Sequence, residues 1–329
     1  MAKKGTKEHY SFIEAPVVEA EILASAREAE AERALHPRGV PVKRPFSFGR
    51  WFKATGWRHI VGLAMVAFAL FPIVFVVSSS LNPYGTLTGS NALFSQIGFE
   101  AYARILTNPQ VPFTAWFGNT LLVAGVTAIL TVFLGALAAY SFSRMRFTGR
   151  RFGLIAIVVI QMFPQMLAVV AIFLVMSAIS DWFPAIGLNT QIGLIMVYLG
   201  GALGVNTFLM YGFFNTVPAS IDEAAKIDGA GHVRIFFTII LRLAAPILAV
   251  VALLSFIFSV NEFVVASVLL IDTENQTLAV GLTKLVSNPR YADWSAFSAG
   301  AVLAALPVVA LFLFLQKYIV GGLTAGAVK

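Results

Sequence analysis

Long apolar runs alternate with short polar segments along most of the 329-residue chain. An α-helix needs about 20 apolar residues to cross the hydrocarbon core of a bilayer, and several runs are longer than that. Six such stretches occur, at 60–99, 106–143, 152–180, 182–221, 243–271 and 294–316. Only Glu262, in the stretch 243–271, places a charged residue inside any of them. Because unpaired backbone groups cannot face lipid, the pattern predicts an all-α polytopic membrane protein with six transmembrane helices.

Two features predict where this helical pattern is interrupted. Pro164, in "QMFPQM", removes a backbone donor and is expected to kink the third transmembrane helix. The loop 82–115 is expected to be external and to cap the helix bundle, and its segment "FEAYARIL" has the pattern of a weak amphipathic turn.

Charge supports the membrane assignment and predicts its sidedness. The chain is 58% hydrophobic and 12% charged, whereas soluble domains average roughly 25% charged residues. Of the 23 Lys and Arg residues, eleven lie in the first 58 residues, four in 144–151, three in 226–242 and two at the C-terminal end. The intervening loops hold only Arg104, Lys284 and Arg290. Positive residues mark the cytoplasmic side, so both termini are expected there, and the net charge of +7 requires no nucleic-acid partner.

Residues 1–56 form a polar N-terminal extension with no apparent cleavable signal peptide. Its segment "APVVEAEILASAREAEAERAL" has helical composition, and "HPRGVPVKRP" has the composition of a linker. Two interpretations stay open: a solvated helical tail, or a segment that docks onto a cytoplasmic partner. Residues 57–329 are expected to form the transmembrane domain.

A polar insert at about 218–242 separates two of the apolar stretches. Pro218 prevents the preceding helix from continuing, and Ser220 with Glu223 forms a predicted capping box. Gly229 is a natural helix stop because it adopts a left-handed conformation readily. The predicted helix, about 221–228, is too short to be stable alone. It must pack either on its own bundle or against another protein.

The insert resembles the EAA loop of ABC-importer membrane subunits. The resemblance rests on "EAAKIDG", nine further residues and "IIL", with matches at Glu223, Ala224, Ala225, Gly229, Ile239 and Leu241. Arg242 stands where the family pattern has Pro, and Pro246 is expected to keep the bend one turn later. In that family the loop is a coupling helix that sits in a cleft of the ATPase subunit. The resemblance therefore implies contacts with an ATPase subunit from Ser220, Glu223, Ala224, Ala225, Asp228 and Gly229.

Other stretches extend the resemblance over about 60–329. "NTLLVAG", "ALAAYSFSRMRFTGRR", "QMFPQML", "AIGLNTQIGLIMVYLGG", "TLAVGL" and "KYIVGGLTAGAVK" are similar, in order, to MalG-type permease subunits of maltose/maltodextrin importers. The resemblance implies the type I ABC importer transmembrane fold in the inner cell membrane, working by alternating access. The implied partners are a second, MalF-like permease subunit, a MalK-like ATPase dimer, an extracytoplasmic sugar-binding protein, the lipid bilayer and the sugar.

The chain itself lacks the motifs of an enzyme. It contains no Walker A sequence and no cysteine, and no HExxH or Ser-His-Asp pattern is present. No cofactor or metal is expected on this chain, and ATP with Mg is expected in the partner ATPase subunits. The chain is therefore expected to be the non-catalytic subunit of an ATP-hydrolysing transporter.

Polar residues within the apolar stretches are candidates for lining a translocation path. Glu262 is the strongest, because an ionisable group at membrane depth normally faces a cavity or a partner, although it could also be a buried packing residue. The weaker candidates are Asn119, Gln165, Asn206 and Asn261. Polar amides can equally bridge helices.

The resemblance also implies roles for the last external loop and the C-terminal tail. In the family, the loop corresponding to 272–293 reaches into the sugar-binding protein, which points to Asn275, Gln276 and Asn288. The tail 321–329 resembles one that contacts the ATPase dimer, which points to Gly322, Thr324 and Gly326.

Three other functions stay open from the sequence. One is an ion-coupled secondary transporter that uses Glu262 as its proton-carrying carboxylate. Another is a membrane scaffold with no transport role. The third is an ABC importer for trehalose or another glucoside.

Overall fold

The computed structural model describes residues 20, 23–28, 30–31, 48–85 and 93–325, and these ranges contain helices and loops but no strand. The chain divides into two compact units, residues 1–67 and 68–329. In the first unit, the described residues between 20 and 31 are helical, as the composition of that segment predicts. The linker 36–45 lies outside the described residues. This unit continues through α2 (Phe48–Trp51) and a π-helical turn (Phe52–Gly56) into the first part of α3 (Trp57–Ser80), whose remainder belongs to the second unit.

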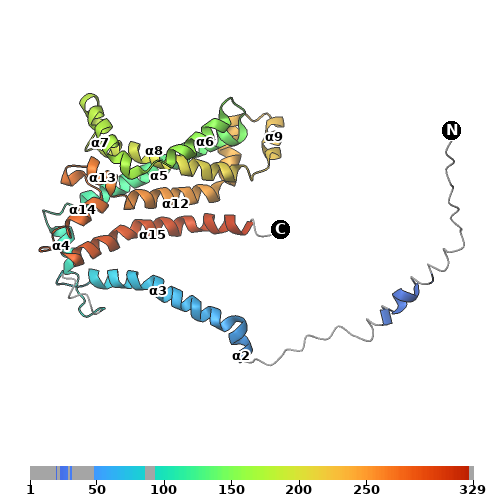
Figure 1. Cartoon of the computed structure of the whole chain (residues 1–329), viewed down its shortest axis with the longest axis horizontal. Helices are drawn as coiled ribbons and strands as arrows, with labels where there is room; N and C mark the ends of the chain where they lie inside the picture. Colours follow the sequence, from blue (N-terminus) through green and yellow to red (C-terminus); the bar gives the residue numbers. More distant parts are fainter. Residues whose placement is uncertain (1–19, 21–22, 29, 32–47, 86–92, 326–329) are drawn as a thin grey trace, which may run out of the picture. The chain divides into compact units, whose positions relative to one another are not determined.

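The second unit is built around four long helices. These are α5 (Phe113–Arg144), α8 (Gln191–Phe214), α12 (Ala245–Asn261) and α15 (Trp294–Ala325). Helix α5 packs against both α8 and α12, and α12 packs against α15, so the four lie side by side (Figure 1). The short helix α9 (Ala219–Ile227) lies at one end of this bundle, and α4 (Glu100–Thr107) and α14 (Leu278–Lys284) lie at the opposite end (Figure 1).

Membrane-spanning elements agree with the predicted number if each bent pair of helices counts as one span. Among the described residues, four helices are long and apolar enough by themselves: Trp57–Ser80, Phe113–Arg144, Gln191–Phe214 and Trp294–Ile319. Two further pairs qualify together, Arg150–Gln161 with Met166–Trp182 and His232–Leu243 with Ala245–Asn261. Six spans result.

Both bent pairs bend close to a proline. The first pair, α6 (Arg150–Gln161) and α7 (Gln165–Trp182), bends by 101° around Pro164, as predicted. The second pair bends by 78° at Ala244, and Pro246 lies in the first turn of α12. A proline there removes no hydrogen bond, because the first turn of a helix has unpaired N–H groups. The 78° bend shows that the chain turns here, close to Pro246, although Arg242 stands where the family pattern has proline.

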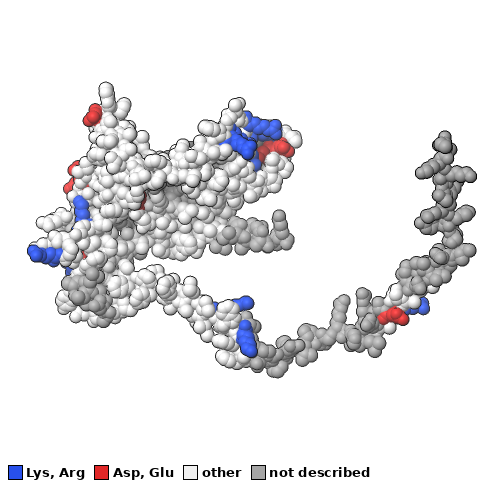
Figure 2. Space-filling model, viewed as in Figure 1, with Lys and Arg blue, Asp and Glu red and all other residues white. Residues whose placement is uncertain are grey.

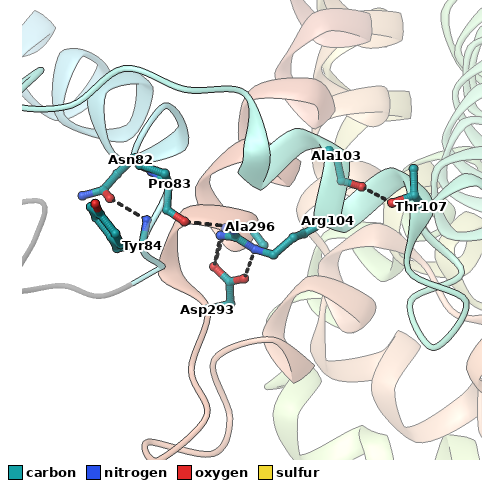
Figure 3. Close-up of polar contacts among 8 residues, drawn as sticks. All are labelled: Asn82, Pro83, Tyr84, Ala103, Arg104, Thr107, Asp293 and Ala296. Carbon is teal, nitrogen blue, oxygen red and sulfur yellow. Dashed lines mark hydrogen bonds and ion pairs between the residues drawn. The ribbon is translucent and has the colours of Figure 1, made fainter.

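Helix α4 forms the predicted cap, with Ala101 and Ile105 buried. Arg104 of α4 makes a two-pronged ion pair with Asp293, with Nε 2.8 Å from Oδ2 and Nη2 3.1 Å from Oδ1 (Figure 3). Its third nitrogen donates to the Pro83 carbonyl at 2.9 Å (Figure 3). One guanidinium thus fastens α4 to the loop that follows α3 and to the start of α15.

The loop 272–293, which we expected to be polar and external, is more folded than predicted. It contains a 3₁₀ turn (Thr273–Asn275) and α14, and Leu278, Val280 and Leu282 of α14 are buried. The apolar "TLAVGL" sequence packs inward, because burying these side chains stabilises the fold more than exposing them. Only 287–291 forms a run of exposed residues in the second half of the loop.

Candidate functional site

The N-terminus of α9 differs from the predicted capping box. The helix begins at Ala219 with Pro218 at the N-cap, and no side chain caps it. Ser220 therefore lies inside the first turn, where its hydroxyl cannot act as an N-cap for Glu223. Pro218 is extended, with ψ 132°, and its restricted φ already sets the direction in which the helix starts.

The C-terminus of α9 confirms the predicted glycine stop. Gly229 has φ +80°. Its N–H donates to the Lys226 carbonyl at 3.0 Å, and the Ala230 N–H donates to the Ala225 carbonyl at 2.9 Å. These two bonds form a Schellman motif, which pairs carbonyls that would otherwise be left without donors.

Helix α9 has an inner and an outer face. Asp222 and Ala225 are buried against the bundle, so Ala225, which was expected to contact a partner, lies on the inner face of α9. Ser220, Glu223, Ala224 and Asp228 are exposed, as a partner-contacting role requires. Ile227 also belongs to this outer face and is 87% exposed. The outer face of this short helix thus exposes charged side chains beside the apolar side chain of Ile227.

A buried ion pair joins the inner face of α9 to the end of α5. Arg144 Nε lies 2.5 Å from Asp222 Oδ2, and the two side chains are 11% and 7% exposed. Arg144 also donates through Nη2 to the Val217 carbonyl at 2.8 Å. The sequence analysis did not predict this pair. The available signal was an arginine that directly follows one apolar stretch and an aspartate in the polar insert 218–242.

The other predicted centre, Glu262, lies at a break between helices rather than inside one. Helix α12 ends at Asn261, and α13 (Val264–Leu269) begins two residues after Glu262. The carboxylate accepts hydrogen bonds from the Val265 N–H at 2.8 Å and the Ala266 N–H at 3.0 Å. These donors belong to the first turn of α13, whose N–H groups lack partners within the helix. The carboxylate therefore stabilises the restart of the helix after the break.

Glu262 also lines a cavity of about 450 Å³ between α6, α7, α8, α12 and α13. The Tyr198 hydroxyl donates to Glu262 Oε2 at 2.6 Å. Gln161, at the end of α6, donates to the Gly201 carbonyl at 2.8 Å and lines the same cavity. Tyr198 was not predicted. The structure thus places Glu262 against a cavity, as expected, and its role in a path stays a prediction.

The remaining path candidates lie at separate places. Asn119 donates to the Glu274 and Gln276 carbonyls, at 2.7 and 3.1 Å, near the N-terminal end of α5. Asn206 is buried and donates to Ser255 Oγ at 3.1 Å, which is the helix-bridging arrangement. Asn261 is exposed and donates to the Ile257 carbonyl of its own helix. Gln165 begins α7.

The loop and tail candidates are also dispersed. Gln276 is buried, and its amide donates to the Leu270 carbonyl at 3.3 Å, so it does not lie on the surface of the chain. Asn275 donates to the Asn189 carbonyl at 3.1 Å, and Asn288 is exposed in a turn. Gly322 and Thr324 belong to the last turns of α15, whereas Gly326 lies outside the described residues.

Charged side chains gather at the two ends of the bundle. Figure 2 shows Lys and Arg concentrated at the end that carries α9, with few charges on the side of the bundle between the ends. The exposed basic residues of the loop after α5, of the start of α6 and of α9–α11 are Arg146, Arg151, Lys226, Arg234 and Arg242. Within the described ranges, no three His, Cys, Asp or Glu side chains come together as metal ligands.

The family model for the binding-protein-dependent transport system inner membrane component matches residues 131–324. The chain belongs to this family and is a multi-pass inner membrane protein.

The alignments with curated relatives cover most of the chain. The maltose/maltodextrin transport system permease protein MalG of Escherichia coli (strain K12) is 39% identical over 282 residues, covering 82% of this chain and 94% of that protein. MalG of Vibrio parahaemolyticus is 39% identical over 292 residues, covering 85% and 98%.

Solved structures agree with the fold. A bacterial ABC transporter involved in the import of the acidic polysaccharide alginate has a chain that matches with a TM-score of 0.67 and 27% identity, covering 83% of this chain and 99% of that one. A complex of the bacterial alginate ABC transporter with its alginate pentasaccharide-bound periplasmic protein has a chain that matches with a TM-score of 0.61 at 15% identity. This second likeness concerns the fold alone.

Proposed function

We infer that this chain is the transmembrane permease subunit of an ATP-driven importer for maltose/maltodextrin-type sugars. The observation that carries the proposal is the 39% identity to MalG, which extends over 82% of this chain and 94% of the relative. Identity over nearly a whole relative supports a shared role far better than a match to one motif.

Helix α9 supports the coupling part of the proposal. Its outer face displays Glu223, Ala224 and Asp228 around Ile227, and Val233 follows in α10 (His232–Ile235) with 73% of its surface exposed. Exposed apolar side chains with a polar rim are typical of a protein–protein contact. We assign this surface to an ATPase subunit, which binds ATP and Mg in place of this chain. In the assembled transporter, a MalK-like dimer contacts this chain and a second, MalF-like permease subunit.

The proposed mechanism is alternating access. Closure of the ATPase dimer on ATP displaces α9, and the helices that pack on α9 move with it. The cavity beside Glu262 and Tyr198 then changes its access between the two sides of the membrane. The external segment around Asn275 and Asn288 faces the sugar-binding protein that the family description implies.

The proposed orientation places both termini in the cytoplasm. Basic residues at the α9 end of the bundle support it, because positive residues favour the cytoplasmic side. The tail after α15, including Gly326, then lies on the side of the ATPase subunits.

The test is reconstitution of the complete transporter. The chain is co-expressed with its permease and ATPase partners, placed in proteoliposomes with ATP inside, and supplied with binding protein loaded with labelled maltose, maltotriose or trehalose. We expect ATP-dependent uptake of maltose and maltotriose that a protonophore does not abolish. ATP-dependent uptake of trehalose alone would replace the sugar assignment. Uptake driven by a proton gradient without ATP would overturn the proposal in favour of an ion-coupled carrier, which family membership does not favour.

A further inference from the structure

Arg144 holds the α9 segment at two points. Its guanidinium pairs with Asp222 inside α9 and donates to the Val217 carbonyl just before the helix begins. Among the described residues, neither carboxylate oxygen of Asp222 accepts a hydrogen bond of good geometry. The positive charge of Arg144 is therefore the main compensation for burying this carboxylate, and removing it leaves a buried charge without its partner.

Packing adds a second attachment one turn earlier in α5. Tyr140 is buried and its ring lies 5.2 Å, centroid to centroid, from the ring of Phe236, which follows α10. Phe214 at the end of α8 and Ala225 of α9 belong to the same buried cluster. The segments before, within and after α9 are thus all fastened to the last turns of one helix.

The opposite end of α5 holds the external segment 273–278. Trp116 Nε1 donates to the Thr273 carbonyl at 2.6 Å, and Asn119 Nδ2 donates to the Glu274 carbonyl at 2.7 Å. The Leu278 N–H donates to Thr120 Oγ1 at 2.7 Å. The external segment is therefore attached to α5 through three neighbouring side chains.

Between these two attachments α5 is continuous. It has 32 residues and no proline, which corresponds to a helix about 48 Å long. The pairs α6–α7 and α10–α12 bend by 101° and 78°, and α15 contains Pro307. Helix α8 is also unbroken but is shorter, with 24 residues. A continuous helix moves as a rigid element, whereas a broken one absorbs movement at its bend.

We propose that α5 transmits movement across the membrane, with the Arg144–Asp222 pair as the joint that links it to α9. Nucleotide-driven displacement of α9 then moves the external segment 273–278, and contact at the external segment acts back on α9. This reciprocity follows from thermodynamic linkage between two sites that share one moving element. The inference rests on the proposed function, because it assumes that α9 meets the ATPase subunit.

The experiment uses the complete transporter in lipid nanodiscs and proteoliposomes. Arg144→Gln, Asp222→Asn and the charge swap Arg144→Asp/Asp222→Arg are compared with Arg146→Gln, which removes an exposed arginine from the same region. Because the chain contains no cysteine, a Glu274→Cys variant, with cysteine-free partners, carries a single fluorescent reporter on the external segment. Retention of the ATPase subunits, uptake stimulated by loaded binding protein, and the response of the reporter to ATP are measured on each sample.

We expect both single variants to keep their ATPase subunits but to lose about tenfold in stimulated uptake, together with the ATP response of the reporter. The charge swap should restore a large part of both, and Arg146→Gln should behave like the wild type. Wild-type uptake and reporter response in the single variants would overturn the proposal. Loss of the ATPase subunits from the single variants would also overturn it, because the pair would then serve assembly rather than transmission. Failure of the proposed function is distinct, because the unmutated transporter would then show no ATP-driven sugar uptake.

Discussion

Replacing Gly229 tests whether the end of α9 sets the geometry of the coupling surface. Gly229 has φ +80°, and a Cβ added there would meet nothing within 4 Å. The effect of a substitution therefore comes from backbone strain rather than from a clash. An L-residue in the left-handed region costs about 1–2 kcal/mol, Asn somewhat less because it tolerates this region, and a β-branched residue more. We expect the order Gly, Asn, Ala, Val from the least to the most perturbed.

The strain should weaken binding of the ATPase subunit. A cost of about 1–2 kcal/mol in the binding-competent shape corresponds to about a 5- to 30-fold loss of affinity. The assay titrates purified ATPase subunit onto permease complexes in nanodiscs that carry each variant. Gly231→Ala is the matched control, because Gly231 has φ −74° and open space around it. Equal affinities for Gly229→Val and the wild type would refute the view that the glycine stop shapes this surface.

Two further variants test the external packing and the cavity. Gly281→Ala places a Cβ 2.2 Å from the buried Trp116 ring, which should lower the free energy of unfolding by about 1–3 kcal/mol. Thermal unfolding in detergent measures it, and Gly118→Ala, in open space on α5, should not destabilise the protein. Tyr198→Phe removes the 2.6 Å hydrogen bond to Glu262 and should destabilise the protein by about 1.5 kcal/mol with lower uptake. Unchanged unfolding and uptake would mean that this bond has no role in the cavity.

The spans and the helix stop were predictable because they depend on local properties. A run of apolar residues long enough to cross a bilayer has few other structures available to it. Glycine adopts the left-handed conformation readily whatever its neighbours are, so a helix stop at Gly229 could be predicted. The bends near Pro164 and Pro246 were predictable for the same reason, because a proline restricts the backbone whatever its neighbours are.

The contacts that depend on distant residues were not predictable. An aspartate in the first turn of a helix can interact with the helix dipole or form an ion pair with a basic side chain. Asp222 pairs with Arg144 because the end of α5 packs beside α9, which the local sequence does not show. Gln276 was predicted to be an exposed loop amide, but it is buried just before the start of α14. The capping box failed because the helix began before Ser220, and helix ends are the least certain feature of a sequence pattern.

The exposure of Ile227 and Val233 at the basic end of the bundle has a consequence for how the transporter is made. A copy of this chain without its partner subunits exposes these apolar side chains to water, and chaperones and proteases can bind such a patch. A neighbouring subunit that covers Ile227 and Val233 stabilises the folded chain by mass action, so the stability of this chain depends on its assembly.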